Sequence, residues 1–209
     1  EWNAIGLDRL KVAVNLSARQ FLDRELLARI DETLSQTGVA AEQIEVELTE
    51  TAAMVDEDHT RAIFGKLRDR GVSIAIDDFG TGYASMSYLR RLPFDKLKID
   101  REFVSEVQNN AQSQAICDAL IALAGGLGLS LLAEGTETEA EVDYLRGRGC
   151  HMFQGYYFSK PVAPVEFVTN AAALALTATA MKMRRADGRE AVPASRAEFD
   201  HAEPGAMRA

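Results

Sequence analysis

The sequence contains few cysteines and no long hydrophobic run. Its two cysteines, Cys117 and Cys150, lie far apart in apolar or glycine-rich surroundings. This argues against a disulfide framework or a cysteine-ligated zinc site and fits a reducing, cytoplasmic compartment. The longest apolar stretch, at residues 171–180, is far shorter than the roughly 20 residues that a membrane-spanning helix needs. A basic segment followed by an apolar one is also absent from the first residues, so we expect no signal peptide there.

Positive charge is scarce. The 209 residues include 23 Lys and Arg against 32 Asp and Glu, which gives a formal net charge of -9. Proteins that bind duplex nucleic acid cluster basic side chains to neutralise phosphates, so this balance argues against a nucleic-acid groove. Any phosphate-bearing ligand would therefore need metal ions as intermediaries.

Short aliphatic runs alternate with amphipathic segments along the chain. The aliphatic runs predict β-strands at residues 11–17, 43–50, 72–79, 95–100, 129–135 and 149–155. Apolar positions three and four apart predict helices at residues 23–38, 57–71, 83–92, 113–128 and 136–149. This alternation predicts a parallel sheet with right-handed crossovers in a domain at residues 1–175. Residues 176–209 lose the periodicity and are expected to form a frayed helix end and a disordered tail.

Polar side chains stand at the carboxyl end of nearly every predicted strand. Parallel α/β folds form their active sites there, because the strand ends converge while the loops are free to vary. Six strands that converge in this way favour an α/β barrel of the TIM type over an open sheet. The side chains concerned are Asn15, Glu47, Asp77, Asp78, Lys98, Glu134 and Gln154.

The adjacent carboxylates Asp77 and Asp78 indicate a cation site. Two ionised carboxylates in contact raise each other's pKa unless a positive charge lies between them. In two-metal phosphodiester chemistry, a shared carboxylate bridges ions roughly 3.5–4 Å apart. The alternative is that the pair only caps a turn, but the polar residues at the other strand ends argue against it. Oxygen ligands favour Mg²⁺ or Mn²⁺ over zinc, and here they come from Asn15, Glu47, Asp77, Asp78 and Glu134.

Five stretches of the chain resemble the EAL domain of bacterial cyclic-di-GMP phosphodiesterases, in order and in spacing. They are VNLSARQF (14–21), EVELTE (45–50), IAIDDFGTGYASMSYLRRLPFDKLKID (74–100), LLAEGTET (131–138) and GCHMFQGYYFSKP (149–161). The resemblance is highly specific because the five stretches occur in register. It implies a TIM-like (βα)8 barrel of the EAL type, of which this chain supplies about six βα units. It also implies hydrolysis of cyclic di-GMP to the linear dinucleotide pGpG with two Mg²⁺ or Mn²⁺ ions.

The resemblance implies roles for individual side chains. The metal ligands would be Asn15, Glu47, Asp77, Asp78 and Glu134. Of these, Asp77 would bridge the two ions. Lys98 would position or deprotonate the attacking water, and Gln154 would help hold the water and the metal shell. Glu50 resembles the glutamate that braces the DDFGTGY loop, and residues 79–86 resemble the segment that links dimerisation to metal binding.

The chain departs from the family at its first residues. The Glu-Ala-Leu string that names the family does not occur in the sequence. The first two strands and an arginine expected to meet a substrate phosphate are also missing. We therefore expect either a fragment of a longer protein or a chain that borrows the missing strands. A longer parent could carry sensor or GGDEF-type domains or a membrane anchor upstream. The fragment alone is expected to bind metal weakly and to turn over little substrate.

The sequence is compatible with three functions. A phosphodiesterase is favoured because every ligand position visible in the chain is filled. The rival is a sensor that binds cyclic di-GMP without cleaving it, and the third is a dimerisation module for another signalling domain. The expected partners are cyclic di-GMP, as substrate or ligand, and a second copy bound through the loop after Asp78.

Overall fold

The computed structural model of the chain describes residues 10–80, 91–164 and 166–167. Packing divides the chain into one unit of residues 1–161 and another of residues 162–209. Nearly all of the described residues belong to the first unit. The predicted domain end at residue 175 lies outside the described residues, as does most of the predicted helix at 83–92, so both stay predictions.

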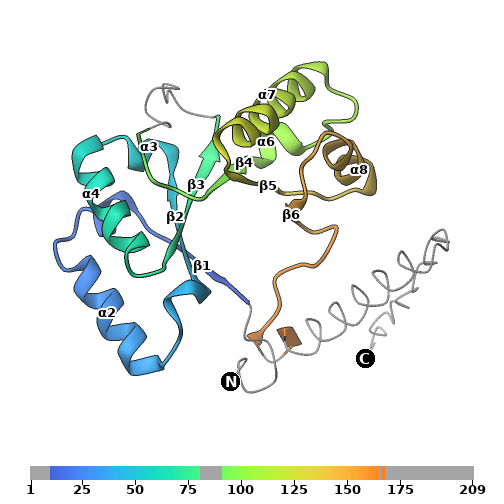
Figure 1. The fold of residues 1–209 in the computed structure, drawn as a ribbon. Helices are drawn as coiled ribbons and strands as arrows, with labels where there is room; N and C mark the ends of the chain where they lie inside the picture. Colours follow the sequence, from blue (N-terminus) through green and yellow to red (C-terminus); the bar gives the residue numbers. More distant parts are fainter. Residues whose placement is uncertain (1–9, 81–90, 165, 168–209) are drawn as a thin grey trace, which may run out of the picture. The chain divides into compact units, whose positions relative to one another are not determined.

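Six parallel strands form one sheet in sequence order. They are β1 (Val12–Asn15), β2 (Ile44–Thr49), β3 (Ser73–Phe79), β4 (Lys96–Ile99), β5 (Ser130–Glu134) and β6 (Met152–Gln154). Every pair of neighbours is parallel, and the sheet curls as part of a barrel with helices on its outer side (Figure 1). All six predicted strands are confirmed, and the curled parallel sheet with its outer helices confirms the TIM-like fold.

Among the described residues, four long helices and several short ones connect the strands. The long helices are α2 (Leu26–Thr37), α4 (Glu57–Arg68), α7 (Ala111–Leu127) and α8 (Glu139–Gly147), and each matches a predicted amphipathic segment. The short ones are α1 (Ala18–Phe21), α3 (Glu50–Ala53), α6 (Arg101–Val104) and the 3-10 helix η2 (Ala41–Gln43). The short helices escaped prediction because three or four residues are too few to show a period. In the described part of the chain, no helix is both long and apolar enough to cross a membrane.

The apolar core lies between the sheet and the outer helices. On β3, Ile74 and Ile76 are fully buried, and they belong to one cluster with Phe64 and Leu67 of α4. Alternate residues of a strand point to opposite faces of the sheet, so the neighbours of these isoleucines face the inside of the barrel. The apolar start of the central strands β2, β3 and β4 is explained by burial on both faces, whereas all four residues of β1 are exposed in this chain.

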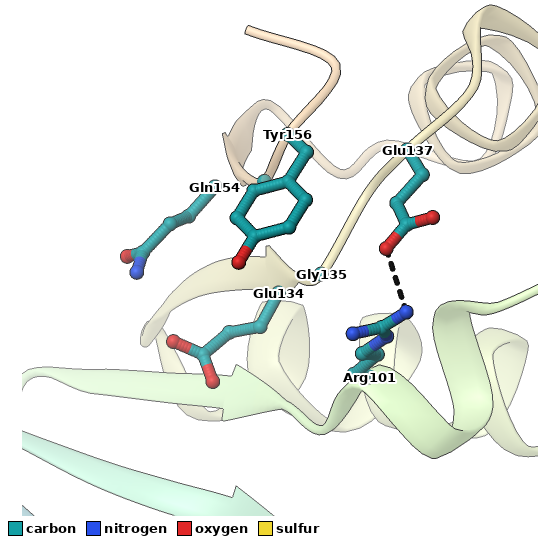
Figure 2. A pocket seen from close by; sticks show the side chains of 7 residues that line it. Arg101, Glu134, Gly135, Glu137, Gln154 and Tyr156 are labelled. Atoms are coloured by element: carbon teal, nitrogen blue, oxygen red, sulfur yellow. Dashed lines mark hydrogen bonds and ion pairs between the residues drawn. The ribbon is translucent and has the colours of Figure 1, made fainter. Parts of the chain in front are cut away.

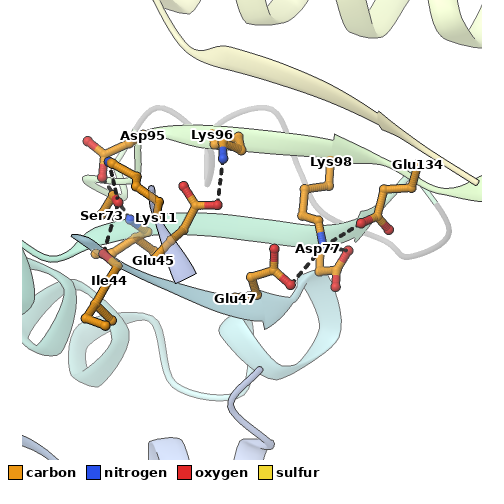
Figure 3. A network of polar contacts seen from close by, with 11 residues as sticks. Lys11, Ile44, Glu45, Glu47, Ser73, Asp77, Asp95, Lys96, Lys98 and Glu134 are labelled. Carbon is orange, nitrogen blue, oxygen red and sulfur yellow. Dashed lines mark hydrogen bonds and ion pairs between the residues drawn. The ribbon is translucent and has the colours of Figure 1, made fainter. Parts of the chain in front are cut away.

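Two layers of ion pairs line the inner face of the sheet (Figure 3). Nearer the amino ends, Lys96 Nζ lies 2.6 Å from Glu45 Oε1. Nearer the carboxyl ends, Lys98 Nζ lies 2.9 Å from Glu47 Oε2. The layers are two residues apart on both β2 and β4, which is the repeat of inward-facing positions in a barrel strand. The upper layer is where the predicted site residues gather.

Candidate metal centre

Site residues from four adjacent strands meet around one ammonium group. Lys98 Nζ on β4 lies 2.9 Å from Glu47 Oε2, 3.1 Å from Asp77 Oδ1 and 2.6 Å from Glu134 Oε1 (Figure 3). The Lys98 side chain is only 3% exposed, so these contacts form away from bulk water. Parallel pairing in register brings the four strand ends to the same rim. Residues up to 87 positions apart in the sequence, Glu47 and Glu134, therefore contact one atom.

An irregular end of β3 turns Asp77 and Asp78 toward the same centre. In a regular strand, neighbouring side chains point to opposite faces. Asp78 has a φ of 54°, in the left-handed region, and the pairing of β3 with β4 shifts register between Ile76 and Phe79. As a result, one carboxylate oxygen from each of Asp77, Asp78 and Glu134 lies within 4.8 Å of the others. Local backbone strain thus assembles a carboxylate trio.

The centre contains more negative than positive charge. Four carboxylates, from Glu47, Asp77, Asp78 and Glu134, share it with the ammonium of Lys98. Burial raises the pKa of Asp78, and the neighbouring charge of Asp77 adds to this effect. Burial also raises the pKa of Glu134 to about 7, against the opposing effect of Lys98. Burial alone would lower the pKa of Lys98, but hydrogen bonds to Glu134 and Glu47 outweigh it and raise that pKa. Clustered oxygen donors with excess negative charge fit a hard divalent cation.

Asn15 and Gln154 lie at the two outer strands of the described sheet. Asn15 ends β1 and is paired in register with Glu47, while Gln154 ends β6 and is paired in register with Glu134. Both side chains are exposed. Their positions beside predicted ligands support the roles expected for them, which stay predictions.

Glu50 links the end of β2 to the end of β3. It is the first residue of α3, it is 3% exposed, and its Oε2 accepts a hydrogen bond from the Gly80 N–H at 3.0 Å. Gly80 has a φ of 100°, which few residues other than glycine adopt. The contact supports the expected bracing of the segment after Asp78. Residues 81–86 of the predicted dimerisation loop lie outside the described residues.

A pocket of about 260 Å³ opens beside Glu134 (Figure 2). It is lined by Arg101, Glu134, Gly135, Glu137, Gln154, Gly155 and Tyr156. Arg101 Nη2 pairs with Glu137 Oε1 at 2.6 Å across one side of it. Arg101, Glu137 and Tyr156 are not among the predicted site residues. Each of them follows a predicted site residue by two or three positions. A polar or aromatic residue just beyond a strand end was therefore the signal in the sequence that could have found them.

Gly155 allows the end of β6 to lie against the segment after β5. The Thr136 N–H donates to the Gln154 carbonyl at 3.2 Å, and the Tyr157 N–H donates to the Thr136 carbonyl at 3.0 Å. A Cβ added at Gly155 would lie 2.1 Å from the Thr136 carbonyl oxygen and 2.4 Å from its nitrogen. Only glycine permits this approach, which places Gln154 beside Glu134.

Gly155→Ala is therefore expected to lower the free energy of unfolding by about 1–3 kcal/mol, because one of the two backbones must move. Gly147→Ala is the matched control. A Cβ there meets nothing within 4 Å, and alanine is favoured over glycine inside a helix by about 0.5–1 kcal/mol. Urea denaturation should therefore show opposite signs for the two variants. Equal midpoints would contradict the close approach at Gly155.

Comparison with known proteins gives consistent matches. The profile of the EAL domain family matches residues 1–161. Cyclic di-GMP phosphodiesterase NbdA of Pseudomonas aeruginosa is 44% identical over 157 residues, which are 75% of this chain and 20% of NbdA. The PaMucR phosphodiesterase in complex with c-di-GMP has a TM-score of 0.77 at 39% identity, over 79% of this chain and 67% of that chain. The manganese/cy-diGMP complex of Klebsiella pneumoniae BlrP1 has a TM-score of 0.70 at 32% identity, over 77% of this chain and 41% of that chain. The chain spans between 20% and 24% of the length of the first curated relatives that it matches.

Proposed function

This chain belongs to the EAL domain family, and from that premise we propose that it forms part of a metal-dependent phosphodiesterase that hydrolyses cyclic di-GMP. The convergence of Glu47, Asp77 and Glu134 on a single buried point carries the proposal. Carboxylates kept out of water at such short spacing are costly for a fold that has no use for them. Their retention together with Lys98 favours an active site over a purely structural role.

We propose that the centre holds two divalent ions, Mg²⁺ or Mn²⁺. Support comes from the oxygen donors of the centre and from BlrP1, which has been solved with manganese and with calcium, each together with cy-diGMP. Such ions, when bound, neutralise phosphate charge and lower the pKa of water. The ligands would be Asn15, Glu47, Asp77, Asp78 and Glu134, with Asp77 bridging the ions.

The chain's own side chains would position the reactants. Lys98 stands among three carboxylates with its ammonium fixed, and it would hold the attacking water in line. Gln154 would hold the same water from the rim, and Glu50 would keep the segment after β3 in place. In the reaction, the oxygen of water forms a bond to phosphorus and the bond from phosphorus to one ribose oxygen breaks. That oxygen takes up a proton, and the product is pGpG.

The domain context is also a proposal. Residues 1–175 would be part of an EAL domain and residues 176–209 a tail. The protein around this chain would carry sensor or GGDEF-type domains and form a homodimer through the loop after Asp78. MucR of Pseudomonas aeruginosa, which is 40% identical over 161 residues, is a bifunctional diguanylate cyclase and phosphodiesterase. A cytoplasmic location of this domain fits the cysteine content.

Product analysis tests the function. The full-length protein should convert cyclic di-GMP to pGpG in the presence of Mn²⁺, as followed by chromatography, and should stop when EDTA is added. The absence of product at high protein concentration would contradict catalysis. The sensor function would then show as calorimetric binding of cyclic di-GMP without turnover.

A further inference from the structure

Glu141, in the first turn of α8, is a buried carboxylate with three backbone partners. Glu141 as a whole residue is 4% exposed. Its Oε1 accepts from the Glu106 N–H at 2.9 Å, and its Oε2 accepts from the N–H groups of Glu137 and Thr138 at 2.8 and 2.9 Å. Burial alone would raise the pKa of Glu141, but these N–H groups outweigh it and hold the pKa below its usual value. The carboxylate is therefore charged and uses both oxygens.

Helix capping explains only part of this arrangement. In the capping box of α8, Thr138 Oγ1 accepts from the Glu141 N–H at 3.3 Å while the Glu141 side chain accepts from Thr138. The bonds to Glu137 and Glu106 lie outside the box. Glu106 has a φ of 54°, a conformation that costs free energy in a residue with a side chain. Glu141 thus also holds a strained turn 35 residues away in the sequence.

Glu141 joins the two segments that follow β4 and β5. Residues 98–106 run from Lys98 through α6 to the strained turn, and residues 134–138 run from Glu134 to the start of α8. An ion pair between Arg101 and Glu137 also joins them, but its side chains are 61% and 43% exposed. Exposed pairs of this kind contribute little because water and salt screen them. Beyond the β4–β5 ladder, the carboxylate of Glu141 is a buried connection between these two segments.

We infer that Glu141 is a positioning residue for the metal centre, because it fixes the segment that carries Glu134 against the segment that carries Lys98. The inference rests on the proposed function. Glu134 makes the shortest of the three contacts to Lys98, at 2.6 Å, so its placement is sensitive to a shift between these segments. Groups outside the ligand shell that orient ligands commonly change metal affinity or activity by about 10–100-fold when mutated.

Glu141→Gln in the full-length protein is the direct test. Glutamine keeps the size and one acceptor oxygen, so the capping box can form, but its NH2 group cannot accept from the Glu106 N–H. Titration calorimetry with Mn²⁺ and no substrate should show the apparent Kd raised about tenfold. Saturating Mn²⁺ should return the rate of pGpG formation toward that of the wild type. If this variant does not fold, Glu141→Asp keeps the charge on a shorter side chain and should also raise the Kd.

Two neighbouring variants separate positioning from stability. Thr138→Ala removes one half of the capping box and leaves the carboxylate, so the melting temperature should fall while the Kd for Mn²⁺ stays unchanged. Glu139→Gln removes a charge from the same turn at an exposed position and should change neither. A Kd equal to wild type in Glu141→Gln would overturn the inference even if the melting temperature fell. A wild type that bound no Mn²⁺ would overturn the proposed metal centre together with the inference, whereas binding without hydrolysis would contradict only the proposed catalysis.

Discussion

Asp77→Asn is expected to lower the turnover of cyclic di-GMP by about 10³-fold. Asp77 is 8% exposed and its Oδ1 lies 3.1 Å from Lys98 Nζ. The amide has nearly the same shape, so the fold should survive while the negative charge between the proposed ions is lost. Removing one group that stabilises charge in a transition state costs about 10²–10³-fold in rate, and three orders of magnitude correspond to about 4 kcal/mol in the barrier.

Initial rates of pGpG formation over a series of Mn²⁺ concentrations measure this effect. Asp143→Asn provides the matched control, since it makes the same chemical change on an α8 side chain that is 61% exposed. The control should keep the wild-type rate. Near-normal turnover in Asp77→Asn would refute the bridging role of Asp77, and recovery only at high Mn²⁺ would indicate that the residue contributes to affinity alone.

The centre of the sheet could be predicted because strands β2, β3 and β4 are buried on both faces. The run at 72–79 is apolar up to Ile76 and then changes to two aspartates, which marks both a strand and its functional end. The same rule located Glu47, Lys98 and Glu134, which lie at or near the carboxyl ends of neighbouring parallel strands. The short helices after β1, β2 and β4 could not be predicted, since one turn shows no periodic pattern.

The finer geometry of the site depends on backbone features that a sequence pattern does not report. Strict alternation would place Asp77 and Asp78 on opposite faces of β3, and only the left-handed φ of Asp78 and the register shift bring both to the centre. Glu141 illustrates the same limit. Its motif predicts a capping box, whereas its bond to the Glu106 N–H depends on how two distant segments pack.

Lys98→Met is expected to lower the free energy of unfolding by about 3–5 kcal/mol in the presence of a chelator. Methionine fills the same space, but Glu47, Asp77 and Glu134 then remain buried together without the ammonium that lies within 3.1 Å of each. Divalent ions can take over this neutralising role. Mn²⁺ should therefore stabilise the variant against urea more than it stabilises the wild type, while turnover should stay low because the variant lacks the side chain proposed to position the attacking water.

Lys96→Met is the control that makes this comparison specific, because it breaks a buried ion pair in the lower layer of the same barrel. Lys96 lies 2.6 Å from Glu45, and their side chains are 16% and 6% exposed. This variant should also lose stability in chelator. Mn²⁺ should not restore it, since one carboxylate cannot replace the several oxygen ligands that a hard cation requires. If Mn²⁺ stabilised both variants equally, or if Lys98→Met were as stable as wild type in chelator, the carboxylates around Lys98 would not be a cation site.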